Sequence, residues 1–168
     1  MRFLTLILFL APQFSFSSER FSDLALFQDM SGKWEGKIVT HVTDPPSIFG
    51  KADTENTISE DGKTFTIETT TQYRGQKIMT KGIFSKLQED GTFTVTIILP
   101  RLDAQKHQGR ILKNLNGYKI TGFNPARQSD FASTTVLNGN RIGFVLILAN
   151  EEGIYEIAEQ GSLTRIID

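Results

Sequence analysis

Apolar and polar residues alternate along most of the chain after residue 30, which predicts β-strands. In the segment 63–73, Phe65, Ile67 and Thr69 share one face and threonine or glutamate occupies the other. The same period of two runs through 33–42 and 92–99, and a strand places successive side chains on opposite faces. Further strands are expected at 76–87, 108–115, 117–123, 131–137, 141–149 and 154–167.

Turn dipeptides separate these segments. Asp61-Gly62, Asp90-Gly91, Asn116-Gly117 and Asn138-Gly139 each combine residues that accept a positive φ, the strongest short-range signal for a β-hairpin. No helical pattern intervenes between the strands, so consecutive strands should pair in an antiparallel up-and-down meander. Closure of this sheet into a barrel, by pairing of its first and last strands, would remove the two exposed sheet edges. The sequence therefore predicts an all-β barrel of about eight to ten strands.

Two segments depart from this alternation. Residues 141–149 are apolar on both faces, which indicates that something covers the outer side of that strand. Residues 22–30 favour a short helix, with Ser22 as a candidate N-cap and Leu24 and Phe27 on one side. That helix either covers the apolar strand or closes one end of the barrel.

The first residues have the pattern of an export signal. A basic start is followed by the apolar run 3–11, by Pro12, and by small residues at Ser15 and Ser17. We expect a signal peptide over residues 1–17 and one domain over 18–168, in a periplasmic or secreted protein. The apolar run is shorter than the ~20 residues needed to cross a bilayer, so no stable membrane anchor is expected after cleavage.

Composition narrows the classes of function. The chain has 18 Lys and Arg against 19 Asp and Glu, and no basic block, which argues against nucleic acid as a partner. It has no cysteine, which excludes thiol catalysis, thiolate metal sites and disulfides. Burial alone must then hold the fold together.

Two short patches resemble the calycin group, which comprises lipocalins, fatty-acid-binding proteins and lipocalin-like domains of bacteria. They are residues 27–34, which end in Gly32-Lys33-Trp34, and Leu163-Thr164-Arg165. The resemblance implies that Trp34 packs at the closed end of the barrel and that Arg165 lies across it and bonds the N-terminal turn. Gly32, Trp34 and Arg165 would then be structural. The chain lacks the Thr-Asp-Tyr motif and the disulfides of classical lipocalins, so it is most similar to the bacterial lipocalin-like domains, for which the group implies no single activity.

The inward register of such a barrel would be apolar. The residues expected to line a ligand pocket are Ile38, Phe65, Ile67, Phe93, Val95, Ile97, Tyr118 and Phe144. This lining suits an acyl chain, an isoprenoid or an aromatic ring, although the same residues could instead fill the interior as a packed core. Arg74, Arg110 and Arg141 are candidates to pair with a ligand carboxylate if any of them turns inward.

Few residues suit catalysis or a cofactor. Of the two histidines, His41 falls on the charged face of the first strand and His107 in a polar loop, so neither metal nor cofactor is expected. Glu156 and Glu159 fall on opposite faces of the last strand, so that one of them could face inward. An inward carboxylate beside a cavity would favour an enzyme.

Three hypotheses follow. The leading one is an exported lipocalin-like protein that binds a small apolar ligand inside the barrel without transforming it. The second is a protein-interaction scaffold that holds a partner through the loop 43–51, with Ile48 and Phe49 exposed. The third is a barrel enzyme, such as an isomerase or hydrolase, that acts on an apolar substrate.

Overall fold

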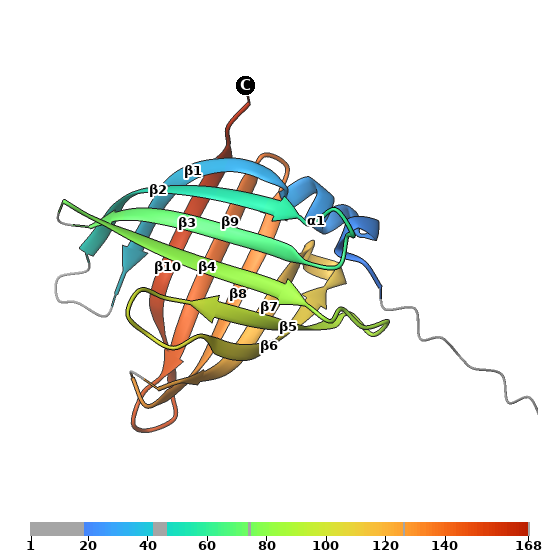
Figure 1. Ribbon diagram of the computed structural model, residues 1–168. Coiled ribbons are helices and arrows are strands. Elements are labelled where there is room, and N and C mark those ends of the chain that lie inside the picture. Colours follow the sequence, from blue (N-terminus) through green and yellow to red (C-terminus); the bar gives the residue numbers. More distant parts are fainter. Residues whose placement is uncertain (1–18, 42–46, 74, 126, 168) are drawn as a thin grey trace, which may run out of the picture.

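The predicted all-β barrel is confirmed. In the computed structural model, which describes residues 19–41, 47–73, 75–125 and 127–167, ten antiparallel strands form one closed barrel (Figure 1). Each strand pairs with its neighbours in the chain, and β1 pairs with β10 to close the ring. The strands are β1 (Gly32–Thr40), β2 (Ser47–Ile58), β3 (Phe65–Tyr73), β4 (Gln76–Ser85), β5 (Thr92–Ile98), β6 (Gln105–Leu112), β7 (Gly117–Asn124), β8 (Ser129–Asn138), β9 (Arg141–Ala149) and β10 (Tyr155–Arg165).

The predicted turns have the expected backbone. Gly62, Gly91, Asn116 and Gly139 have φ values of 71°, 80°, 45° and 56°. Only glycine, and to a lesser degree asparagine, adopts these values at low cost, so the four dipeptides fix where the strands reverse.

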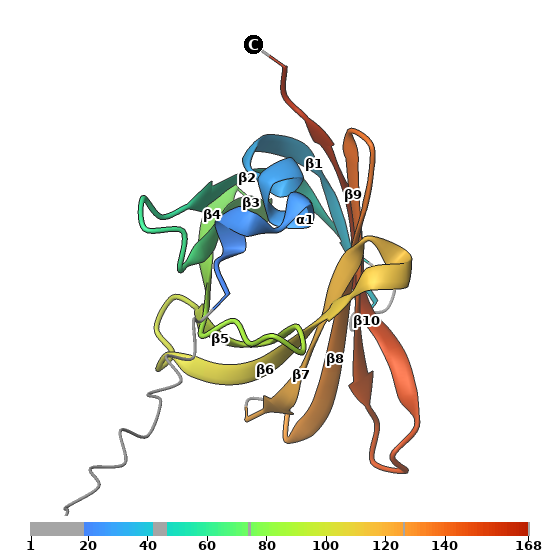
Figure 2. The same ribbon diagram turned by 90° about the vertical axis from the view of Figure 1, so that its right-hand side faces the viewer.

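The short helix closes one end of the barrel. The 3-10 turn η1 (Phe21–Asp23) and helix α1 (Ala25–Met30) bury Phe21, Leu26, Phe27 and Met30. Figure 2 shows α1 set within the ring of strands at that end. The helix therefore acts as a plug rather than as a cover for the outer side of β9. We call this the closed end and the opposite end of the barrel the far end.

One strand was missed by the sequence analysis. β2 occupies residues 47–58, where the sequence indicated a loop over 43–51 and no strand. Its inward residues include Ala52, Thr54 and Asn56, all buried, while its outward residues are exposed. Because the buried face of β2 is largely polar, the strand shows little apolar alternation.

Strand boundaries shift at two other places. The loop predicted over 100–107 ends earlier, because β6 begins at Gln105. β10 contains a bulge between Ile157 and Glu159; before it Glu156 pairs with Leu148, and after it Glu159 pairs with Leu146. Since residues 146 and 148 share a face of β9, the expectation that Glu156 and Glu159 face opposite ways is wrong.

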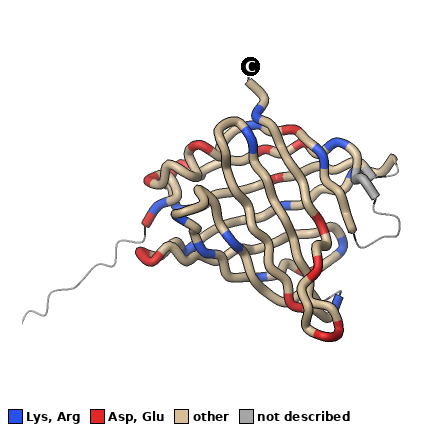
Figure 3. Tube along the Cα trace, turned by 180° about the vertical axis from the view of Figure 1, so that it is seen from behind, with Lys and Arg blue, Asp and Glu red and all other residues tan. Residues whose placement is uncertain are grey.

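The outer surface carries the charged residues, with both signs intermixed (Figure 3). Lys51 bridges Glu35 and Asp53 at 2.7 and 3.2 Å, and Lys81 pairs with Glu68 at 2.6 Å. The pairs Lys51–Glu35 and Lys81–Glu68 span neighbouring strands and Lys51–Asp53 lies within β2; all three are exposed, and each contributes little to stability. No helix of the described residues is long and apolar enough to cross a membrane.

Candidate functional site

The two residues expected at the closed end lie against each other. Trp34 and Arg165 are direct partners in the pairing of β1 with β10, and the guanidinium carbon lies 4.4 Å from the indole centroid. The Arg165 guanidinium also donates to the carbonyls of Ser31, at 2.9 Å, and Asp29. Arg165 thus connects the closing strand to the end of the plug.

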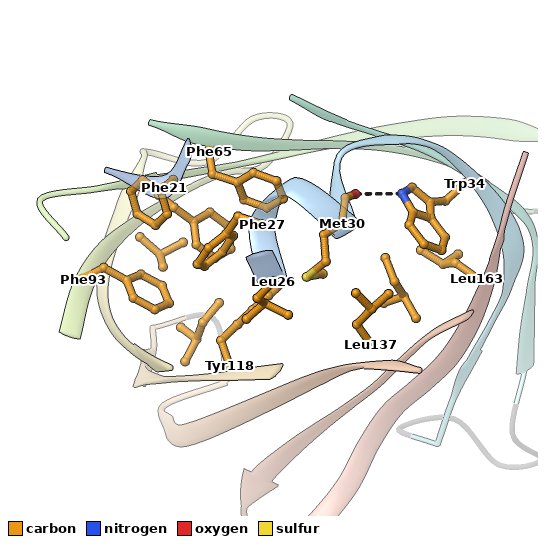
Figure 4. Packing of buried hydrophobic residues seen from close by; sticks show 14 of the residues in the cluster. Phe21, Leu26, Phe27, Met30, Trp34, Phe65, Phe93, Tyr118, Leu137 and Leu163 are labelled. Carbon is orange, nitrogen blue, oxygen red and sulfur yellow. Dashed lines mark hydrogen bonds between the residues drawn. The ribbon is translucent and has the colours of Figure 1, made fainter. Parts of the chain in front are cut away.

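The carbonyl of Met30, the last residue of α1, is a second connection. It accepts hydrogen bonds from the Trp34 Nε1–H at 2.9 Å and from the Asn56 amide nitrogen at 2.8 Å (Figure 4 shows the former). β1 and β2 are therefore both bonded to the plug.

Aromatic rings from the plug and the surrounding strands pack together and fill much of the closed end. Phe27 is fully buried, with its ring centroid 4.8 Å from that of Phe21 and 4.9 Å from that of Phe65 (Figure 4). Phe84, Phe93 and Tyr118 complete the group. Phe65 and Phe93, which were expected to line a ligand pocket, belong to this packed layer.

A cavity of about 550 Å³ occupies the interior between these rings and the far end, and all ten strands contribute to its wall. Among its lining residues are six of the eight predicted ones: Ile38, Ile67, Val95, Ile97, Tyr118 and Phe144. The barrel is therefore packed at its closed end and hollow beyond it. Whether these six residues contact a ligand stays a prediction.

The two sides of the cavity differ in polarity. β2, β3 and β4 contribute hydroxyl and amide side chains, namely those of Thr54, Asn56, Thr69, Thr71 and Thr80. Two of these hydroxyls, on Thr54 and Thr69, bond each other at 3.1 Å. β8, β9 and β10 contribute more apolar than polar groups: Phe131, Ile142, Phe144, Leu146 and Leu163 against Ser133, Thr135 and Glu159. The lining predicted from the sequence contains no threonine and no asparagine, although Thr69 falls on the same face as Phe65 and Ile67, so the polar side of the cavity was not predicted.

Glu159 is the single acidic residue among the residues that line this cavity. It pairs across the sheet with Thr40 and Leu146, near the far end, and it is partly buried. Burial raises the pKa of the Glu159 carboxyl, and the positive charge of the exposed Arg127 opposes that rise. A carboxyl with these surroundings can accept a hydrogen bond in either protonation state.

His107 also lines the cavity, so its assignment to a polar surface loop is wrong. The imidazole packs edge-on against Phe131 at 4.8 Å between centroids, and burial lowers the pKa of His107 below its usual value. At neutral pH the ring is therefore uncharged, with one donor and one acceptor nitrogen. His41 directly follows the last residue of β1 and is exposed.

Two buried side-chain polar atoms of the described residues have no hydrogen-bond partner within the chain: Asn56 Oδ1 and His107 Nε2. Both belong to residues of the cavity wall. The amide of Asn56 is oriented by the Met30 carbonyl, which accepts only from the nitrogen, so the oxygen is the free atom. Buried polar atoms without partners are rare in folded proteins, so two in one cavity wall are informative.

Tyr118 is bonded within the protein. Its hydroxyl interacts with Thr135, and burial raises the pKa of Tyr118 to about 12. The phenol therefore stays neutral across the physiological range.

The arginines considered as partners of a ligand carboxylate are not in the wall. Arg110 and Arg141 are exposed, and neither lines the cavity. Arg74 lies outside the described residues. Lys81 is among the residues that line the cavity, but its amine bonds Glu68 on the outer surface.

The remaining candidate sites add little. Ile48 and Phe49 lie in β2, paired with Val39 and Ile38, rather than in a loop, and the description of the structure does not extend to their side chains. The predicted signal peptide, residues 1–17, lies outside the described residues. Within the described ranges, no group of three or more His, Asp or Glu side chains could hold a metal ion.

Comparison with known proteins supports the fold. No protein-family model matches the chain, and no curated protein matches its sequence. Among solved structures, the chain is similar to Rv2717c from M. tuberculosis, with a TM-score of 0.62 and 13% identity over 86% of this chain and 99% of that one. It is also similar to a protein of unknown function from the DUF3598 family of Nostoc punctiforme, with a TM-score of 0.55 and 14% identity over 83% of this chain and 49% of that one. At these identities the likeness concerns the barrel fold alone.

Proposed function

We propose that this protein is a lipocalin-like carrier that binds one small, mainly apolar molecule inside the barrel. The observation that carries the proposal is the cavity of about 550 Å³, which lies within the size range typical of small-molecule sites. Its wall combines a broad apolar surface with a few polar groups, the usual composition of such sites. Export to the periplasm or the exterior remains part of the proposal, because it depends on the N-terminal segment.

Closure of one end also supports this function. The closed end is filled by the plug, by the aromatic layer and by the Trp34–Arg165 contact. A ligand would therefore enter from the far end, where partly exposed residues such as Gln105 and Glu159 line the cavity. A rigid barrel with one entrance loses little conformational entropy when it binds, which favours affinity.

The test is binding of N-phenyl-1-naphthylamine, a neutral fluorophore that brightens in apolar sites. Gly82 lies in the cavity wall, and a Cβ built there meets only Phe84, at an ordinary 3.5 Å. The variant Gly82→Leu should therefore fill the cavity and lower the affinity at least about tenfold, since each 1.4 kcal/mol of lost contact changes affinity tenfold.

Gly143→Leu is the matched control. Gly143 is exposed on β9, and a Cβ there meets nothing within 4 Å. This variant should bind the fluorophore as the natural chain does. Equal binding by Gly82→Leu and the natural chain would place the fluorophore elsewhere and refute the proposal.

Proton transfer within the same cavity is a second candidate function. The observation that favours it is Glu159, a partly buried carboxyl with a raised pKa in the cavity wall. Glu159 would act as the general acid or base on an apolar substrate. Loss of turnover of a bound compound in Glu159→Gln, with its binding retained, would distinguish this enzyme from a carrier.

A further inference from the structure

We infer that the ligand carries a hydrogen-bond-donating head group without negative charge, an alcohol or an amine, on an apolar body. This inference rests on the proposed function and specifies the class of ligand. It excludes the carboxylate of a fatty acid, which the sequence analysis had considered through its arginines.

The charges of the wall are the first argument. Glu159 supplies the acidic group, and the basic side chains near the wall are engaged or uncharged: the Lys81 amine bonds Glu68 and the His107 imidazole is neutral. Arg127 acts on Glu159 from an exposed position outside the wall. A carboxylate transferred into this cavity would lose its hydration without gaining a cation, and it would lie beside another acid.

The hydrogen-bond acceptors of the wall are the second argument. His107 Nε2, the other unpartnered atom, donates or accepts according to the tautomer of the ring and so favours neither kind of ligand. Asn56 Oδ1 can only accept a hydrogen bond, and Asn56 itself is 2% exposed. Glu159 can accept in either protonation state. Asn56 lies next to the plug and Glu159 toward the far end, so acceptors stand at both ends of the cavity. Both ends of the cavity therefore favour a ligand that donates a hydrogen bond.

The polar side formed by β2, β3 and β4 is the third argument. Its hydroxyls can donate and accept, and that of Thr71 already donates to the carbonyl of Ile78 at 3.4 Å. Opposite it, β8 to β10 present the large apolar groups Phe131, Phe144 and Leu146, beside the polar Ser133, Thr135 and Glu159. An amphipathic molecule satisfies both sides, whereas a plain hydrocarbon would leave the buried acceptors unpaired at a cost.

Four compounds with one twelve-carbon tail test the head group: dodecylamine, dodecan-1-ol, dodecyl methyl ether and dodecanoate. Each displaces N-phenyl-1-naphthylamine from the full chain at pH 7.5. The amine and the alcohol should displace it at concentrations about tenfold lower than the ether and the carboxylate, the value of one hydrogen bond to a buried acceptor. The ether is the critical control, because it keeps the oxygen of the alcohol and lacks its donor.

Two variants assign the effect to residues. Glu159→Gln should remove most of the preference for the amine over the ether, while Glu156→Gln should keep it. Glu156 shares the strand and the face of Glu159, but it is exposed, accepts from Asn150 at 3.1 Å and does not line the cavity. Asn56→Leu should lower the preference for the alcohol over the ether. Should that variant fail to fold, the comparison of alcohol with ether on the natural chain decides alone.

The outcomes separate this inference from the proposed function. Displacement by dodecanoate as strong as that by the amine, or equal displacement by all four compounds, would overturn the inference. If Gly82→Leu then still abolished fluorophore binding, the carrier function would stand and the free acceptors would be satisfied by ordered water only. Fluorophore binding that Gly82→Leu does not weaken would overturn both.

Discussion

Replacement of Arg165 by alanine should destabilise the fold by about 2.5–3 kcal/mol. The guanidinium 4.4 Å from the Trp34 centroid contributes about 0.5–2 kcal/mol, depending on its desolvation. Its two hydrogen bonds to the carbonyls of Ser31 and Asp29 contribute about 1 kcal/mol each. Because Arg165 is partly exposed, we take the lower part of the summed range.

Urea unfolding followed by Trp34 fluorescence measures this change, because Trp34 is the single tryptophan and is fully buried. The melting temperature should fall by about 5–10 °C, as expected for a chain of this size. Arg165→Lys should recover only part of the loss, since an ammonium keeps the charge but not the planar fork that reaches two carbonyls.

The exposed Arg141 on the neighbouring β9 is the matched control, and Arg141→Ala should change stability by less than about 0.5 kcal/mol. The reasoning fails if Arg165→Ala unfolds at the same urea concentration as the natural chain. It also fails if Arg165→Ala and Arg165→Lys are equally destabilised, because the loss would then not depend on charge over the indole.

Three further predictions concern the interior. Phe27→Ala should cost about 3–5 kcal/mol of unfolding free energy in urea, because it empties the centre of the aromatic layer; a loss below 1 kcal/mol would mean that the layer closes up. Glu159→Gln should raise stability at pH 8 and leave it unchanged below about pH 4. A carboxyl whose pKa is raised on folding stabilises the fold below its unfolded pKa, and that contribution is lost as the pH rises through its folded pKa. Parallel profiles of stability against pH for the variant and the natural chain would contradict this. Gly122→Ala should displace the His107 ring, because a Cβ at residue 122 would lie 2.2 Å from its nitrogen Nδ1. The pKa of His107, measured by NMR, should then rise toward its usual value. An unshifted titration would show that the ring tolerates the methyl group.

The sequence predicted the barrel well where one face of a strand is apolar. The alternation through Phe65, Ile67 and Thr69 and the glycine or asparagine turns identified nine strand segments and their antiparallel order. β2 was not predicted as a strand, because Thr54 and Asn56 face the cavity and a buried polar face has the same composition as a surface loop.

The candidate site was predicted only in part, and the reasons are local. The bulge in β10 turns Glu159 inward, and a bulge changes the side-chain register without a distinctive residue pattern. His107 lies inside because Gly122 leaves room for its ring and Phe131 packs against it, which are contacts across strands. Whether the interior was hollow or packed depended on volumes summed over ten strands, which single strands do not reveal.

The pairing of β1 with β10 has a consequence for how the protein folds. Trp34 meets Arg165, so the contact that closes the ring joins residues near opposite ends of the described chain. Until β10 is available, β1 and β9 each present an unpaired edge to other chains. Such long-range pairing makes folding slow compared with that of helical proteins, and a shortened chain that lacks β10 should aggregate rather than form a smaller barrel.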